Sequence, residues 1–185
     1  MKLEVLDRHT APQAARPLLD TARDAYGFVP NILGVMAHSP ALLEAYMTMS
    51  QIFEKSGFSA AEKQVVLLAV SAENGCDYCT TAHTAIARMQ GVDEAVLDAI
   101  ARSDALPDQR LDELFRFTHT LVEKRGHPSE DDLRAFVAAG YSEAQVQDVI
   151  VGIGMKTLSN YSNHIAGTPV DERFKSEKSL RASLP

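Results

Sequence analysis

The sequence predicts an all-α protein, and three observations support this prediction. Nearly every segment has apolar residues at helical spacing between helix start and stop signals. No segment has the alternating pattern of a half-buried strand. Hydrophobic residues make up 45% of the chain and Trp is absent, which fits a core of Leu, Val, Ile, Ala and Met. The length of 185 residues suits one domain, 1–185, with a tail from about 168 that forms an arm or a short helix.

Local signals define most of the expected helix ends. Ser39-Pro40 is an N-cap followed by proline at the first helical position. The segment Ser59-Ala-Ala-Glu62 is a capping box that opens an apolar helix, and Asn74-Gly75 ends that helix. The expected helices span about 12–26, 31–37, 40–55, 59–73, 76–91, 93–103, 108–124, 129–139 and 142–161.

Charge and cysteine content exclude several classes of protein. With 18 basic and 25 acidic residues the net charge is −7, which argues against a nucleic-acid partner. No stretch approaches the roughly 20 apolar residues of a membrane span, and the N-terminus lacks the apolar region of a signal peptide. We therefore expect a cytoplasmic protein with no membrane partner. Two cysteines in a single CxxC are too few for a secreted disulfide framework and are more typical of catalysis or metal binding.

The segment 73–83 contains the candidate chemistry. Cys76, Cys79 and His83 stand at i, i+3 and i+7, so a helix would place them on one stripe. Asn74-Gly75 places Cys76 near the helix N-terminus, where unpaired amides and the helix dipole favour a thiolate. A thiolate is the nucleophile that redox chemistry requires.

Two thiols at this spacing are able to reduce a hydroperoxide in two steps. One thiolate attacks the O–O bond and becomes a sulfenic acid, which the second thiol converts to a disulfide. A histidine one turn away deprotonates the first thiol or protonates the departing alkoxide. The reductant that reopens the disulfide must come from outside, and we expect a thiol or disulfide protein.

Three other interpretations of the cysteine pair remain open. A structural zinc site would need a fourth ligand, taken from His164, His119 or a carboxylate. A thioredoxin-like fold needs βαβ units, which the pattern lacks. Two buried core cysteines would need no chemistry, but the polar neighbours Asp77 and Tyr78 and the aligned His83 favour a site. We therefore expect no metal and no bound cofactor.

The segment Glu73-Asn-Gly-Cys-Asp-Tyr-Cys-Thr-Thr-Ala-His83 resembles the active-site segment of AhpD-like alkylhydroperoxidases, in the carboxymuconolactone decarboxylase superfamily. The segment 155–164, followed by Thr168-Pro169, is similar to an uncharacterised, peroxidase-related branch of that family. The resemblance covers most of the chain. It implies a compact all-α bundle with the CxxC at the start of a central helix, assembly into trimers or hexamers, and thiol-dependent peroxidase activity.

The resemblance also implies a role for each matched residue. Cys79 matches the thiol that attacks peroxide, and Cys76 matches the more exposed partner that forms the disulfide and meets the reductant. His83 matches the relay histidine. The helix-dipole argument instead favours Cys76 as the more acidic thiol, so the two arguments disagree on the roles, and our assignment follows the resemblance.

The sequence departs from the AhpD pattern at two positions. The glutamate that acts as proton acceptor, twelve residues before the first cysteine, is replaced by Gln64, which takes no proton. The histidine between the cysteines is replaced by Tyr78. Glu62 is explained by its capping box, so we expect Glu73, beside the Asn-Gly break, to supply the base. The alternative for Glu73 is an ordinary solvated carboxylate at a helix end.

Two further functions stay open at this stage. A decarboxylase or lactone-processing enzyme of the same superfamily needs no cysteine pair, so the CxxC counts against it. A zinc-binding or redox-sensing module would show no turnover. His164 is expected either to line the pocket or to cap helix carbonyls or fill a subunit interface.

Overall fold

The structure is a computed structural model that describes residues 2–175. Within these residues the only regular elements are helices, which confirms the all-α prediction. No helix among them is both long and apolar enough to cross a membrane. The elements are η1 (Gln13–Ala15), α1 (Arg16–Tyr26), α2 (Asn31–Met36), α3 (Pro40–Glu54), α4 (Ala60–Glu73), α5 (Asp77–Met89), α6 (Glu94–Arg102), α7 (Gln109–Glu123), α8 (Glu130–Ala138), α9 (Glu143–Ala166) and η2 (Glu172–Phe174).

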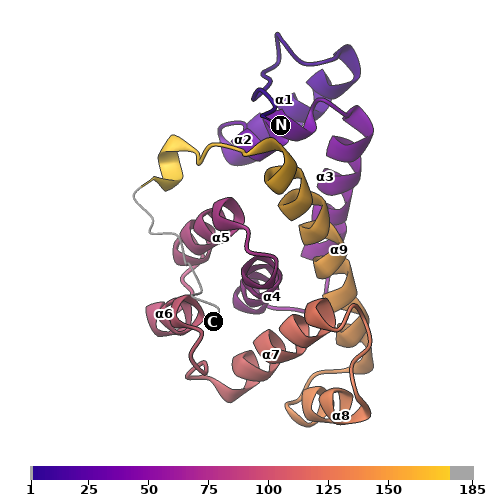
Figure 1. The fold of residues 1–185 in the computed structure, drawn as a ribbon, viewed down its shortest axis with the longest axis vertical. Helices are drawn as coiled ribbons and strands as arrows, with labels where there is room; N and C mark the ends of the chain where they lie inside the picture. Colours follow the sequence, from indigo (N-terminus) through magenta and orange to yellow (C-terminus); the bar gives the residue numbers. More distant parts are fainter. Residues whose placement is uncertain (1, 176–185) are drawn as a thin grey trace.

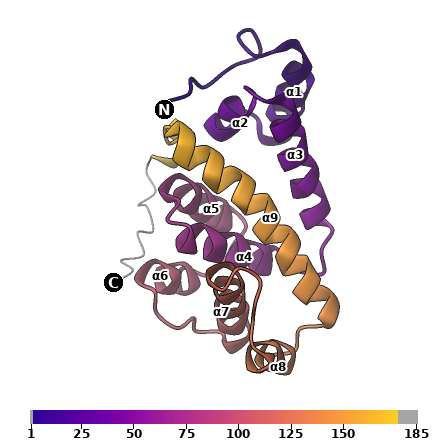
Figure 2. The same cartoon turned by 45° about the vertical axis from the view of Figure 1, so that its right-hand side comes forward.

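The long helix α9 lies at the centre of the bundle. It packs against α3 on one side and against α4 and α5 on the other (Figure 1). The turned view shows the same order, with α1 to α3 on one side of α9 and α4 to α7 on the other (Figure 2). Helix α4 also packs against α5 and α7, and α8 packs against α7 at the far end. The CxxC helix α5 is therefore held between the central helices and the C-terminal segment.

The predicted helix starts are confirmed by side-chain caps. Ser39 accepts a hydrogen bond from the amide of Leu42, and Ser59 forms the expected capping box with Glu62. Ser142 forms a further capping box at the start of α9. These caps act within one helical turn, which is why the sequence alone reveals them.

Helix α9 continues to Ala166, beyond the predicted end near Tyr161, and stops at Gly167 with φ 62°. The polar side chains in its last turns form hydrogen bonds with other elements. They do not compete for the backbone hydrogen bonds of the helix, so the helix continues. The Asn160 Oδ1 accepts from the Asn74 Nδ2 at 2.9 Å, and Asn163 contacts Cys76. The prediction was wrong here because those polar residues were interpreted as a helix end.

The C-terminal segment packs against the bundle as far as the structure describes it. The side chains of Asp171 and Phe174 are buried, and η2 lies against α5. The expected short helix in the tail is thus present as η2, but residues 168–175 do not form a free arm. Residues 176–185 of the predicted arm lie outside the described residues.

Two hydrophobic clusters form the core. The larger one joins α4, α6, α7, α8 and α9, and stacks Phe117, Phe136 and Tyr141. The second lies between α1, α2 and α5 and contains both cysteines. Helix α5 also contributes Ala87 to the larger cluster, so it bridges the two, and the CxxC lies inside the second.

Close helix packing requires glycine at two positions. A Cβ on Gly152 of α9 would lie 2.8 Å from a Val66 methyl group of α4. A Cβ on Gly34 of α2 would lie 2.6 Å from the carbonyl oxygen of Leu6, because the N-terminal segment crosses α2 there. Side chains at either position would force these elements apart.

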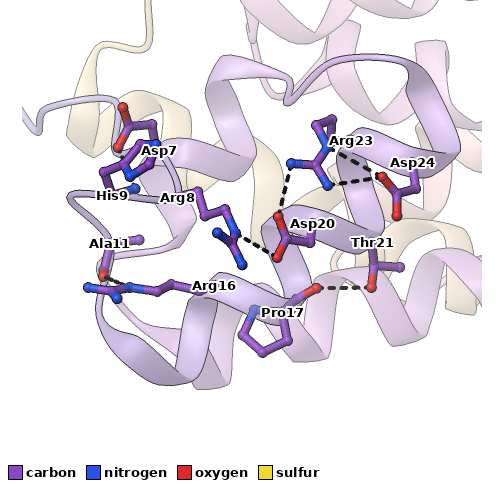
Figure 3. A network of polar contacts seen from close by, with 10 residues as sticks. All are labelled: Asp7, Arg8, His9, Ala11, Arg16, Pro17, Asp20, Thr21, Arg23 and Asp24. Carbon is purple, nitrogen blue, oxygen red and sulfur yellow. Dashed lines mark hydrogen bonds and ion pairs between the residues drawn. The ribbon is translucent and has the colours of Figure 1, made fainter.

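Exposed ion pairs fasten the N-terminal segment to α1 (Figure 3). Asp20 accepts from the Arg8 Nε at 2.8 Å and pairs with Arg23 at 3.1 Å, and Arg23 also contacts Asp24. Each such exposed pair contributes at most about 1 kcal/mol, so the network orients the segment more than it stabilises the fold.

Candidate active site

The break between α4 and α5 positions the two cysteines. Gly75 adopts φ 63°, and the amide of Cys76 donates to the carbonyl of Ser71 at 2.9 Å across the end of α4. This turn makes Cys76 the N-cap of α5 and puts Cys79 in the first turn. The two Cα atoms are 5.3 Å apart and the sulfurs form a disulfide. The CxxC thus opens α5, as the sequence predicts.

Both cysteines are buried. Cys76 is 0% and Cys79 2% exposed. The Cys76 sulfur accepts a hydrogen bond from the Asn163 Nδ2 at 3.4 Å, so α9 covers it. Cys79 instead lines a cavity. The expectation that Cys76 is the more exposed thiol is therefore wrong in this chain.

His83 is held by an amide pair. Its Nδ1 lies 3.0 Å from the Gln64 Oε1, and the Gln64 Nε2 donates to the Gln90 Oε1 at 3.1 Å. Because Gln64 presents its oxygen to the ring, Nδ1 carries the proton and Nε2 keeps its lone pair. Burial, and then the charge of Lys156, hold the pKa of His83 well below 6.5. The imidazole is neutral, with Nε2 as its basic atom.

Lys156 on α9 is a functional candidate that the sequence reasoning missed. Its side chain is 1% exposed, and burial lowers its pKa to about 7. Among residues 2–175, no carboxylate pairs with its ammonium and no hydrogen bond satisfies it. One signal could have found it: Val149 and Gly152, seven and four residues earlier, share its buried helix face.

A cavity of about 530 Å³ connects these groups. It lies where the two hydrophobic clusters meet, and its walls are mainly apolar. Cys79, His83, Gln64 and Lys156 contribute to its lining, and Cys76 does not. The aromatic part of the wall consists of Tyr26, Phe28, Tyr46, Phe53, Tyr78 and Phe174.

Tyr78 closes one wall of the cavity. Its hydroxyl donates to the Asp171 Oδ2 at 2.5 Å and accepts from the amide of Ile32 at 3.3 Å. The Asp171 Oδ1 accepts from the amide of Asn31 at 2.9 Å. Burial, and then the bond to Asp171, raise the pKa of Tyr78 above its usual value. The residue between the cysteines therefore ties η2 and α2 to the cavity.

The remaining candidates lie outside the cavity lining. The Glu73 Oε2 is 2.6 Å from the His119 Nε2, and neither residue lines the cavity. Glu62 forms its capping box and pairs with Arg110 at 3.2 Å. His164 is exposed and lies against the Tyr161 ring. No group of three His, Cys, Asp or Glu side chains in the described part of the chain is arranged to hold a metal ion.

Comparison with known proteins supports the family resemblance. Residues 40–117 match the model of the Carboxymuconolactone decarboxylase family. An uncharacterised peroxidase-related protein from Ralstonia eutropha JMP134, described as an alkylhydroperoxidase AhpD core, is 24% identical with a TM-score of 0.83. That match covers 98% of this chain and 96% of the other.

Two other solved structures have the same fold. A peroxidase-related protein from Silicibacter sp. TM1040 is 20% identical, with a TM-score of 0.78 and 94% and 95% coverage of the two chains. The debrominase Bmp8, in complex with 2,3,4-tribromopyrrole, is 17% identical with a TM-score of 0.78, and the match covers 95% of each chain. No curated protein matches the sequence. Residues 40–117 therefore resemble the carboxymuconolactone decarboxylase family, and the chain as a whole has the same fold as the AhpD-like proteins.

Proposed function

We propose that the protein is a thiol-dependent oxidoreductase that reduces organic hydroperoxides with the Cys76–Cys79 dithiol. One observation carries the proposal. Cys79 lines an apolar cavity together with His83, while Cys76 is within disulfide distance and covered by α9. A hydroperoxide in this cavity meets a single sulfur, and that sulfur has a resolving partner.

The first step oxidises Cys79. The Nε2 of His83 takes the thiol proton, and the thiolate attacks the terminal peroxide oxygen. The O–O bond breaks, a sulfenic acid forms, and the alkoxide leaves. The imidazolium then returns the proton to the alkoxide, which departs as an alcohol. The role of base, expected at Glu73, falls to His83 in this proposal, since Glu73 is paired with His119 outside the cavity.

The second step closes the disulfide. The Cys76 thiol attacks the sulfenic sulfur of Cys79, and water is released. An external dithiol then reduces the disulfide by exchange. We expect a redox protein in this role and a cytoplasmic setting for the cycle.

The chain is also proposed to act as a trimer or hexamer. Large apolar side chains on the solvent face of α9 support assembly: Ile150 is 51%, Tyr161 55% and Ile165 58% exposed. Size-exclusion chromatography with light scattering tests this proposal. A strict monomer would contradict it.

The peroxidase proposal is tested by counting thiols. Fully reduced protein is mixed with one equivalent of cumene hydroperoxide, alongside Cys76→Ser and Cys79→Ser. The wild type is expected to lose both thiols, and Cys76→Ser to stop at a sulfenic acid on Cys79 that dimedone traps. Cys79→Ser is expected to react no faster than free cysteine. If both wild-type thiols persist where free cysteine is oxidised, the proposal fails and the decarboxylase alternative gains weight.

Reductive dehalogenation is a second candidate. Its support is the fold shared with a debrominase that binds a halogenated pyrrole, together with the aromatic cavity of this chain. The same dithiol would supply two electrons: a carbon–bromine bond becomes a carbon–hydrogen bond, bromide leaves, and the thiols become a disulfide. Release of bromide from a brominated pyrrole or phenol by the reduced protein, absent in Cys79→Ser, would favour this activity.

A further inference from the structure

The Lys156 ammonium lines the cavity, and no carboxylate among the described residues pairs with it. The side chain is almost completely buried, and none of the described residues provides its ammonium with an ion pair or a hydrogen bond. Buried charges in proteins are normally paired, because an isolated charge in an apolar environment is costly. The proposed hydroperoxide cycle assigns Lys156 no step.

The other charged side chains of the cavity wall each have a described partner, and none of these partners is Lys156. Glu54 pairs with Lys63 at 3.0 Å, and Arg88 pairs with Glu94 at 2.7 Å. Arg173 lies over the Phe28 ring, 4.5 Å from its centre. Helix α4 contributes Gln64 and α2 contributes only apolar side chains. The titratable or charged side chains around the cavity are Tyr26 of α1, Tyr46 and Glu54 of α3, Tyr78, Cys79, His83 and Arg88 of α5, Lys156 of α9, and Arg173 of η2.

We propose that the cavity is a binding site for an apolar, aromatic organic acid whose carboxylate pairs with Lys156. The volume of about 530 Å³ lies within the range of small-molecule sites, and six aromatic side chains supply the apolar wall. The carboxylate supplies the negative charge that none of the described residues places beside the Lys156 ammonium. The ring of the acid replaces water against the aromatic wall, where it gains hydrophobic contact.

Binding of this acid is linked to uptake of a proton. The pKa of Lys156 is about 7 in the empty cavity, and a bound carboxylate raises it. Affinity therefore falls as the pH rises above about 7, by up to tenfold per unit. The other cavity groups do not reproduce this dependence. Burial raises the pKa values of Tyr46 and Tyr78 and lowers that of His83, so these groups stay neutral in this range.

The proposed binding site also suggests which hydroperoxides the protein reduces. This inference rests on the proposed peroxidase function. A molecule held by its carboxylate at Lys156 and bearing a hydroperoxide at its other end would present the O–O bond to Cys79 in the same cavity. Atoms and electrons balance as in the general cycle. An aromatic acid hydroperoxide becomes the corresponding hydroxy acid while the dithiol becomes a disulfide and water is released.

The binding claim is tested on the disulfide form, so that its result is independent of peroxidase turnover. The probes are 3-phenylpropionate and its neutral counterpart 3-phenyl-1-propanol, measured by titration calorimetry between about pH 6.5 and 9. Measurements in phosphate and in Tris count the protons taken up. The wild type is expected to favour the acid about tenfold at neutral pH and to take up close to one proton at about pH 8.5.

Two variants identify the group that binds the carboxylate. Lys156→Met keeps the length and apolar character of the stem, and it is expected to bind both probes equally, with the wild-type affinity for the alcohol and no proton uptake. Arg173→Met, the matched control on another wall, is expected to retain the preference for the acid. The proposal is overturned if the wild type binds neither probe, binds them equally, or takes up no proton. Preference for the acid that survives in Lys156→Met, or is lost in Arg173→Met, overturns it as well. Thiol counting remains a separate test of the peroxidase function.

Discussion

Replacing Lys156 with methionine should stabilise the protein strongly at neutral pH and weakly at alkaline pH. The pKa of Lys156 falls from 10.5 to about 7 on folding, because burial removes the ammonium from water. Each unit corresponds to about 1.4 kcal/mol. At pH 7, where half of the folded molecules carry a neutral amine, the penalty in the free energy of unfolding is about 4 kcal/mol. Methionine avoids this penalty with a side chain of similar length.

The sign of the pH dependence follows from proton binding. Between about pH 7 and 10.5 the unfolded chain holds a proton on Lys156 that the folded chain has lost. Wild-type stability from this group therefore rises with pH across that window, and the full penalty applies below it. At about pH 10 the penalty has fallen to roughly 1 kcal/mol, so the advantage of Lys156→Met shrinks by about 3 kcal/mol.

Urea unfolding of both proteins at pH 7 and pH 10 measures this difference. Titrating groups that do not interact with Lys156 affect both proteins equally and cancel in the comparison. His83, whose pKa the Lys156 charge lowers, is the exception, and its pKa is measured by NMR in both proteins. Lys63→Met is the control, because the Lys63 ammonium already pairs with Glu54 and should give no gain at pH 7. An advantage of Lys156→Met that is the same at both pH values, or no advantage at all, would refute the assignment of Lys156 as a buried, uncompensated cation.

Three further predictions test the surroundings of the cavity. Gln64→Glu places a carboxylate where an amide oxygen now lies 3.0 Å from the His83 Nδ1, and it should raise the pKa of His83 by roughly 1 to 3 units in an NMR titration; an unchanged titration would contradict the contact. Gly152→Ala brings a Cβ within 2.8 Å of α4 and should lower the free energy of unfolding by roughly 1–3 kcal/mol in urea, whereas a neutral result would show that the helices move apart freely. Tyr78→Phe removes the 2.5 Å bond to the buried Asp171 and should lower the free energy of unfolding by roughly 1–3 kcal/mol, and unchanged stability would mean that water replaces the hydroxyl.

The parts of the fold that depend on neighbouring residues were predictable from the sequence. The capping box of Ser59 and Glu62 and the glycine break before Cys76 act within one or two turns, so their pattern is visible in the chain. The bond between Tyr78 and Asp171 joins residues 93 positions apart, and no spacing rule predicts such a pair. The position of the cysteines on one helix was therefore predictable, whereas the wall that encloses Cys79 was not.

Gln64 and Lys156 show why the charge of the cavity was harder to predict than its thiols. A lysine in a helix usually extends into water, so its residue type gave no indication of burial. The absence of a carboxylate at position 64 was visible in the sequence and was interpreted as a missing base. The missing carboxylate also has a second consequence. The side chain at position 64 contacts His83, and the charge of Lys156 lowers the pKa of the same His83, so a glutamate there would offset this effect of Lys156. The amide at position 64 therefore adds no negative charge beside His83 or Lys156. In the proposed site, a bound carboxylate would supply that charge and leave the His83 Nε2 available to Cys79.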